Sequence, residues 1–320
     1  MPASTDNCLT LITGAWDDLP ALFTRMGLPF RDLGGRLAAL EDPKALRGCR
    51  ALYLACGADY DLSDEGAAAI RAFIAAGGGL YASDLAAAAI ERIFPGKIRF
   101  AMCDYQSNNP VQVVDEGLKL LLGETISLHM DFNSSQGVVE HDLSVRVLIR
   151  GPRQEQEETL HPYLVTFTHG QGEVLYTVFH NANQMEKTEE MLLEYLLLRP
   201  MLLEERRQSL AALNAAKTGP QAAPVQVIAA AQPGQSTGRF ALPLARPGTL
   251  RAALAWRCAA EKPATLGLQV YTPAGKLARY VSSDQSPLVI EAPAPVAGKW
   301  SVSVKGVLGG GEHIPFVLTV

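Results

Sequence analysis

The stretch Phe73–Ile90, FIAAGGGLYASDLAAAAI, decides the fold of this chain. A helix ends at the three glycines 77–79, because glycine adopts positive φ angles at little cost. A short strand, Leu80 to Ala82, follows, and the chain then turns at Ser83-Asp84 into a second helix. Such an elbow at the carboxyl end of a buried strand directs one side chain into the crevice where open α/β sheets bind ligands. Ser83 and Asp84 are therefore the candidate residues here, although Asp is also a favourable helix N-cap.

Apolar runs on both sides of this elbow predict further buried strands. Leu9–Thr13 and Arg50–Ala55 each end in a loop and are followed by a helical pattern. Glu173–Val178 is a late strand that leads to His180, ahead of one long helix from about Met185 to Ala216. Repeated strand, loop and helix units favour right-handed crossovers between parallel strands. We therefore predict a flavodoxin-like, doubly wound and mostly parallel sheet.

The pattern changes after the linker-like segment 218–224, which is rich in Gly, Pro and Ala. From there to the last residue, short apolar runs alternate with Gly, Pro and Ser at regular intervals, which is typical of an all-β sandwich. We expect an α/β domain over residues 1–205, a helical spacer and linker over 206–223, and a β-sandwich over 224–320.

Composition and charge restrict the class of protein. The chain of 320 residues is 48% hydrophobic and 19% charged, as in ordinary globular proteins. No apolar run is long enough to cross a membrane, and the amino terminus has no signal-peptide pattern, so we expect a cytoplasmic protein without a membrane partner. Residues 225–320 carry nine Lys/Arg and four Asp/Glu, and the rest of the chain is acidic. An acidic larger domain argues against a nucleic-acid platform.

The sequence contains no recognisable metal or cofactor motif. Five cysteines are scattered without the paired spacing of a zinc site or a disulfide framework. The oxygen-rich loop 59–64 lacks the central Gly and the distal Glu of a calcium loop. Neither a phosphate-binding loop nor an HExxH motif is present. We therefore predict no metal and no cofactor.

Three predicted strand ends converge if the sheet is doubly wound: Cys56-Gly57, Ser83-Asp84 and His180-Asn181. With this arrangement, residues 1 to about 205 resemble the class I glutamine amidotransferase-like fold. That family has a nucleophilic Cys at the elbow, a His in a His-x-Glu motif after a late strand, and a Gly-rich turn that supplies oxyanion amides. The resemblance maps the elbow to Tyr81–Leu85, the His to His180 in FHNAN, and the turn to Cys56-Gly57.

The chain departs from the family at two catalytic positions. Asp84, or Ser83 after a shift of one residue, occupies the nucleophile position, and Ala182 replaces the Glu that follows the His. Attack on an amide needs a thiolate, a base and a carboxylate that orients the base. The resemblance thus implies a relative without glutaminase activity, similar to the trehalose-utilisation-like branch.

We expect a non-catalytic protein that binds a small ligand or a protein partner near Cys56, Asp84 and His180. Gly57, Ser83, Asn181 and Asn183 are the candidate ligand-binding residues. Two alternatives stay open. One is a hydrolase that uses Asp84 or Cys56 together with His180, and the other is a structural protein with two domains on a helical spacer. The sequence does not determine the partner or the oligomeric state.

The C-terminal runs carry a second resemblance. LQVYTPAGK (268–276), GKWSVSVKG (298–306) and PFVLTV (315–320) resemble the bacterial pre-peptidase C-terminal or P-domain-like β-sandwich. The resemblance implies a role in attachment or stabilisation, with Trp300 and Trp256 in the core. Most such domains are secreted, which differs from the cytoplasmic location expected from the amino terminus.

Overall fold

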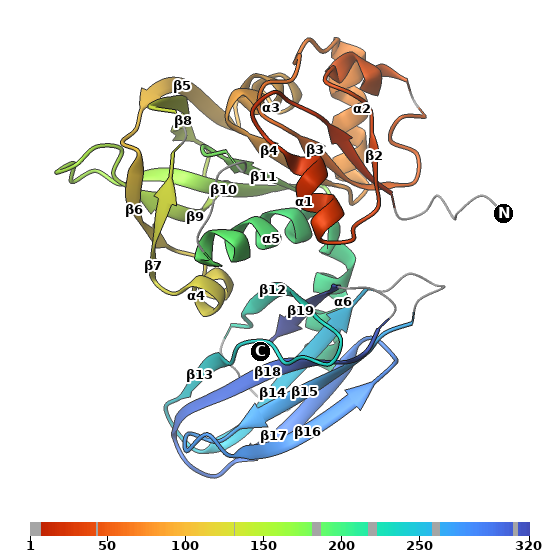
Figure 1. Cartoon of the computed structure of the whole chain (residues 1–320), viewed down its shortest axis with the longest axis vertical. Coiled ribbons are helices and arrows are strands. Elements are labelled where there is room, and N and C mark those ends of the chain that lie inside the picture. The colour runs from red at the N-terminus through yellow and green to blue at the C-terminus, as the bar shows by residue number, and fades with distance from the viewer. Residues whose placement is uncertain are drawn as a thin grey trace. The chain divides into compact units, whose positions relative to one another are not determined.

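The computed structural model describes residues 8–42, 44–130, 132–180, 187–216, 223–257, 263–309 and 313–320. The chain forms two compact units. The first comprises Met1–Asp115 and Leu122–Leu203, and the second comprises Glu116–Leu121 and Glu204–Val320 (Figure 1). Within the described ranges, none of the helices has the length and apolar character needed to cross a membrane.

The first unit is built on a nine-stranded sheet in the order β2-β1-β3-β4-β11-β10-β9-β6-β7. Strands β2, β1, β3, β4 and β11 run parallel, and the remaining four extend the sheet antiparallel. The strands are β1 (Cys8–Ile12), β2 (Phe30–Asp32), β3 (Cys49–Leu54), β4 (Gly79–Ser83), β6 (Asn108–Val113), β7 (Thr125–His129), β9 (Arg146–Gly151), β10 (His161–His169) and β11 (Gly172–Thr177). The predicted flavodoxin-like α/β fold is thus confirmed, with β2 and β7 as strands that the sequence patterns did not indicate.

Helices cover both faces of the parallel half of this sheet. Helices α1 (Leu19–Arg25) and α5 (Lys187–Met201) lie on one face, and α2 (Asp64–Ala75) and α3 (Ala87–Ile93) lie on the other (Figure 1). The buried Tyr53 side chain of β3 contacts both helices of the first face. Its ring packs on Phe23 of α1, and its hydroxyl donates to the Leu197 carbonyl of α5 at 2.5 Å. Side chains of β3 and β4 are therefore buried on both faces, as in other doubly wound sheets.

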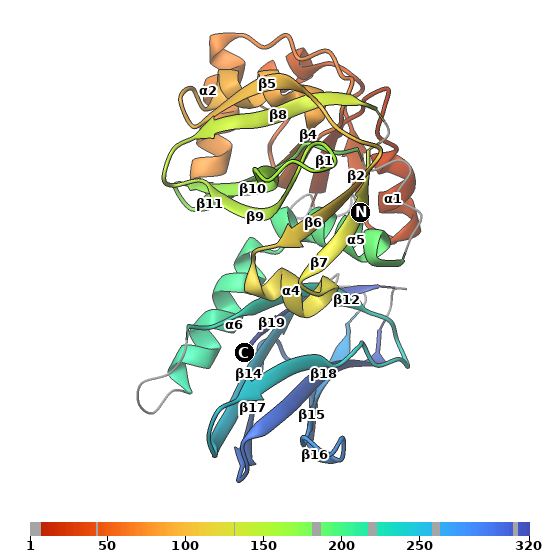
Figure 2. The same cartoon turned by 90° about the vertical axis from the view of Figure 1, so that its left-hand side faces the viewer.

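A separate two-stranded ribbon adjoins the elbow. Strands β5 (Ile98–Asp104) and β8 (Ser134–His141) pair antiparallel outside the main sheet and run side by side (Figure 2). A short helix, α4 (Glu116–Leu122), follows β6 in the chain. The ribbon contacts η2 (Asp84–Ala86), the 3₁₀ turn directly after β4, and thus places the backbone of β8 beside the elbow residues.

The second unit contains an all-β sandwich, as predicted. One sheet has the order β12-β19-β14-β17 and the other β13-β18-β15-β16, and all of their pairings are antiparallel. The core between the sheets includes Trp256 and Trp300, so their predicted burial is confirmed. The strands are β12 (Gln226–Ala231), β13 (Phe240–Leu244), β14 (Gly248–Trp256), β15 (Thr265–Tyr271), β16 (Leu277–Ser283), β17 (Leu288–Ala294), β18 (Gly298–Leu308) and β19 (Ile314–Thr319).

The long helix expected from Met185 to Ala216 is instead two helices, so the prediction of one continuous helix is wrong. Helix α5 ends at Met201, and α6 spans Leu203–Ala215. Pro200 lies in the last turn of α5, where it supplies no backbone N–H and disfavours continuation. Helix α6 packs on the sandwich, since Ser209 Oγ lies 2.6 Å from Thr319 Oγ1. Residues 206–223, expected as a spacer, therefore include a helix that belongs to the second unit.

A buried ion pair joins α5 to the main sheet. The Arg199 guanidinium donates to both carboxylate oxygens of Glu173, at 3.0 and 2.7 Å, and also to the Tyr195 hydroxyl. The side chains of Arg199 and Glu173 are only 4% and 7% exposed. Burial lowers the pKa of Arg199, but the adjacent Glu173 charge outweighs this effect and the net pKa is raised. The guanidinium therefore stays charged, and the bidentate contact makes its burial tolerable.

We predict that Glu173→Gln destabilises the first unit, because Arg199 would stay buried without a countercharge. Loss of one partner of a buried ion pair typically costs about 3–5 kcal/mol. Urea denaturation should show a lower midpoint than in the wild type. Glu140→Gln is the matched control, because Glu140 and its partner Arg99 are 68% and 61% exposed and their pair should leave the midpoint unchanged. Equal midpoints for Glu173→Gln and the wild type would contradict this prediction.

Candidate functional site

The elbow holds Asp84 in an unusual backbone conformation. Strand β4 ends at Ser83, and Asp84 has a φ angle of +39°. A residue with a Cβ avoids this region, and such strain costs about 1–3 kcal/mol and recurs at functional sites. The alternative that Asp84 caps the following helix is wrong, since neither η2 nor α3 has a side-chain cap hydrogen bond.

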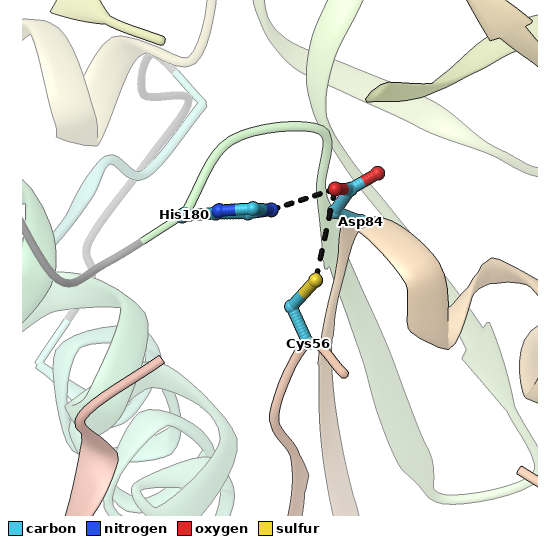
Figure 3. Close-up of side chains that lie close together, drawn as sticks. All are labelled: Cys56, Asp84 and His180. Carbon is cyan, nitrogen blue, oxygen red and sulfur yellow. Dashed lines mark hydrogen bonds and ion pairs between the residues drawn. The ribbon is translucent and has the colours of Figure 1, made fainter. Parts of the chain in front are cut away.

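The structure brings together Cys56, Asp84 and His180, as the predicted strand order implies. Asp84 Oδ2 lies 2.6 Å from His180 Nε2, and it accepts a hydrogen bond from the Cys56 thiol at 3.6 Å (Figure 3). The three side chains come from the carboxyl ends of β3, β4 and β11, and all three are buried. Asp84 and His180 are only 3% and 4% exposed, so their contact is shielded from solvent.

The second carboxylate oxygen of Asp84 is also engaged. Asp84 Oδ1 accepts a hydrogen bond of 2.6 Å from the backbone N–H of Gln136 on β8. The buried Tyr176 hydroxyl donates to the Gln136 carbonyl at 2.6 Å and lies 3.0 Å from the Asp84 carbonyl. The ribbon of β5 and β8 and strand β11 thus hold the elbow on two sides. Sequence reasoning missed Gln136 and Tyr176, and the sequence contains no local signal for a backbone contact between residues so far apart.

The Ser83 side chain contacts the Cys56 backbone and Asp17, and not Asp84 or His180, since its Oγ accepts the Cys56 N–H at 3.1 Å. The Ser83 hydroxyl donates to Asp17 Oδ2, and the same carboxylate oxygen accepts the Cys56 backbone N–H at 2.8 Å. Asp17 precedes α1, which begins at Leu19, and its side chain is buried. Ser83 is itself fully buried. Cys56 therefore lies between two buried carboxylates, one on each side.

Two aromatic rings form a chain of contacts that begins at His180. The Phe132 ring packs edge-on against the His180 imidazole, and the Trp16 ring packs against Phe132, each with centroids 5.2 Å apart. Trp16 and Phe132 are 49% and 42% exposed. Gly57 has a φ angle of +86°, and a Cβ at this position would lie 2.4 Å from the Trp16 ring, so glycine is required there. The predicted ligand-binding residues Asn181 and Asn183 lie outside the described residues.

The surroundings of Cys56 oppose thiolate formation. Burial raises the pKa of the Cys56 thiol far above its ordinary value, and the carboxylates of Asp84 and Asp17 raise it further. A hydrogen bond from the Leu85 backbone amide acts in the opposite direction but does not compensate. The thiol is therefore protonated at neutral pH, and a buried neutral thiol is a poor nucleophile.

The same three side chains have the chemistry of metal ligands. One ligand atom from each of Cys56, Asp84 and His180 lies within 4.8 Å of the other two. Within the described residues, no other cluster of His, Cys, Asp and Glu meets this condition. The arrangement can thus act as a hydrogen-bonded acid–base pair beside a thiol or as a set of three metal ligands.

Comparisons with known proteins give no family assignment. The sequence matches no family model and no curated protein. The structure is similar to a ThuA-like protein from Bacteroides uniformis, with 12% identity and a TM-score of 0.45 over 62% of this chain and 94% of that one. It is also similar to a glutamine amidotransferase from Thermotoga maritima, with 9% identity and a TM-score of 0.36 over 63% of this chain and 86% of that one.

A third likeness extends over nearly the whole chain. A β-galactosidase from Bacillus circulans aligns with 95% of this chain and 42% of its own length, at 10% identity and a TM-score of 0.44. Two of these neighbours are of the kinds named by the sequence resemblance. All three scores are below 0.5, so the fold assignment relies on the strand order itself and no activity is transferred.

We predict that Cys56 resists alkylation in the native protein, because it is fully buried and its thiol is protonated. Native iodoacetamide labelling, mapped by peptide mass spectrometry, should modify the partly exposed Cys103 well before Cys56. Both residues should be labelled equally after unfolding in urea. Fast native labelling of Cys56 would show that the thiol is accessible and reactive.

Proposed function

We propose that the first unit is a non-catalytic, amidotransferase-like domain that binds a ligand or a protein partner at the Cys56–Asp84–His180 site. The observation that carries this proposal is the state of Asp84 at the elbow. A carboxylate stands where an amidotransferase needs a thiolate, and both of its oxygens already accept hydrogen bonds. Nucleophilic catalysis needs a free nucleophile beside its base, and this pair does not supply one.

Burial supports the same proposal. His180 lies beneath Phe132, and its ring is bonded to Asp84, so a substrate cannot reach Nε2 without displacing Asp84. A strained elbow with a buried polar cluster is nevertheless typical of a functional site. Binding without turnover accounts for both the burial of His180 and the strained elbow. A ligand can replace the hydrogen bonds within the cluster by its own, and no covalent bond needs to break.

The test is an assay of the full-length protein against glutamine and a panel of ester and amide substrates. We expect no turnover above the background rate, and we expect His180→Ala to give the same rate as the wild type. His141→Ala is the matched control, since His141 is an exposed histidine at the last position of β8, whereas Gln136, which contacts the site, lies near the first. Hydrolysis by the wild type and by His141→Ala that disappears in His180→Ala would overturn the proposal.

A hydrolase is the second candidate, favoured by one specific observation. The 2.6 Å contact between Asp84 and His180 is within the range in which a carboxylate orients an imidazole base. In this case the imidazole would activate a water molecule, and Cys56 would take no part. Asp84→Asn distinguishes the two candidates, because it should abolish hydrolysis by a water-activating pair and leave a non-catalytic protein unchanged in the assay.

We propose in addition that the sandwich is an interaction domain, in keeping with its resemblance to pre-peptidase C-terminal domains. Strand β16 at the edge of one sheet exposes Leu277 and Tyr280, at 53% and 41%. Apolar side chains on an open edge favour contact with another protein. The cytoplasm stays the predicted compartment, where Cys49, Cys56 and Cys103 would persist as free thiols.

A further inference from the structure

The geometry points to a binding site for a zinc-class transition-metal ion formed by Cys56 Sγ, Asp84 Oδ2 and His180 Nε2. This inference rests on the proposed binding function and deepens it, because it names the ligand. The three atoms are the only group of potential metal ligands of this kind within the described ranges. Figure 3 shows the three side chains pointing toward one another from separate segments.

The donor set selects the class of ion. A thiolate and an imidazole prefer zinc and other borderline or soft transition metals, whereas magnesium and calcium take oxygen ligands. Three protein ligands leave one tetrahedral position for water or another molecule, which is the arrangement of zinc sites with an open position. Magnesium and calcium, which prefer oxygen ligands, are therefore poor competitors for this site.

The distances are close to those of a tetrahedral site. Zinc bonds of about 2.3 Å to sulfur and about 2.1 Å to oxygen place these two ligands about 3.6 Å apart. Cys56 Sγ and Asp84 Oδ2 already lie 3.6 Å apart. Nitrogen and oxygen ligands in such a site lie about 3.4 Å apart. The 2.6 Å between His180 Nε2 and Asp84 Oδ2 must therefore open, which a small rotation of the imidazole can supply.

The surrounding contacts hold the ligands in place. The Gln136 N–H binds Asp84 Oδ1 and leaves Oδ2 directed toward the other two ligands. The Leu85 backbone amide donates to the Cys56 sulfur, and the Asp17 carboxylate fixes the Cys56 backbone. Outer contacts of this kind orient metal ligands and increase affinity. The strained φ angle of Asp84 is explained if the elbow must present its carboxylate at this point.

Metal uptake replaces two hydrogen bonds with three coordination bonds. The ion displaces the thiol proton of Cys56, which passes to solvent. The imidazole Nε2 also releases the proton that it donates to Asp84 Oδ2, and the neutral ring then carries its single proton on Nδ1, so that Nε2 can bind. Asp84 Oδ2 then bonds to the metal in place of accepting from Cys56 and His180. No oxidation or group transfer is involved.

The experiment uses the purified full chain, stripped of metal with a chelator and titrated with Co²⁺ as a spectroscopic probe. We expect a thiolate-to-cobalt charge-transfer band that saturates at about one ion per chain, the stoichiometry of a single three-ligand site. Zn²⁺ should abolish the band by displacement, and Mg²⁺ should not. Zn²⁺ should also raise the midpoint of thermal unfolding, because an ion that binds only the folded state stabilises it.

Variants assign the band to the three residues. Cys56→Ser should lose the charge-transfer band, and His180→Ala should bind Co²⁺ at least about tenfold more weakly, as expected for lost coordination. Cys103→Ser is the matched control, because this free cysteine on β5 lies outside the cluster and its loss should leave the band intact. Circular dichroism checks that each variant is folded. If a variant does not fold, the zinc-dependent thermal shift of the wild type still tests the metal site.

The outcomes separate this inference from the function on which it rests. Absence of both the band and the thermal shift in the wild type would overturn the metal site, as would a band that survives in Cys56→Ser. The substrate assay judges the non-catalytic function independently, with and without Zn²⁺. Metal binding without turnover supports both conclusions. Metal binding with zinc-dependent hydrolysis supports the metal site and overturns the non-catalytic function.

Discussion

The contact between His180 and Asp84 constrains the rest of the first unit. Both side chains are almost fully buried, and a buried polar group without a hydrogen-bond partner is costly, so their mutual contact offsets part of the cost of burying them. The contact joins the ends of β4 and β11, which are neighbours in the sheet. Through Asp84 Oδ1 the same carboxylate also reaches β8, so a single side chain links the parallel sheet to the outer ribbon.

Two polar side chains at the end of β4 have different partners. Ser83, the last residue of β4, donates to Asp17, whereas Asp84, with its φ angle of +39° in the turn that follows, contacts His180. Cys56, which follows the adjacent strand β3, contacts both carboxylates. Its backbone N–H donates to Asp17, and its thiol donates to Asp84. The two carboxylates add to the effect of burial in raising the pKa of the Cys56 thiol.

The second unit depends on a different kind of interaction. Its two sheets enclose an apolar core centred on Trp256, Trp300 and Phe316, and α6 is attached through hydroxyl and amide contacts at β12 and β19. No buried cluster of His, Cys and acidic residues is found in its described part. The one cluster of this kind among the described residues therefore lies in the first unit.

The sequence by itself determined four of the five parallel strands, β1, β3, β4 and β11, together with the elbow, the three strand ends and the sandwich, because periodicity and glycine positions are local properties. Only the tertiary structure decided the orientation of Ser83 and Asp84 and the contact of Gln136 with the elbow. It also decided that Phe132 packs against His180 and that Trp16 packs against Phe132. These features join residues that are distant in the chain, and pairing at that range depends on sheet register and packing, which no local pattern records.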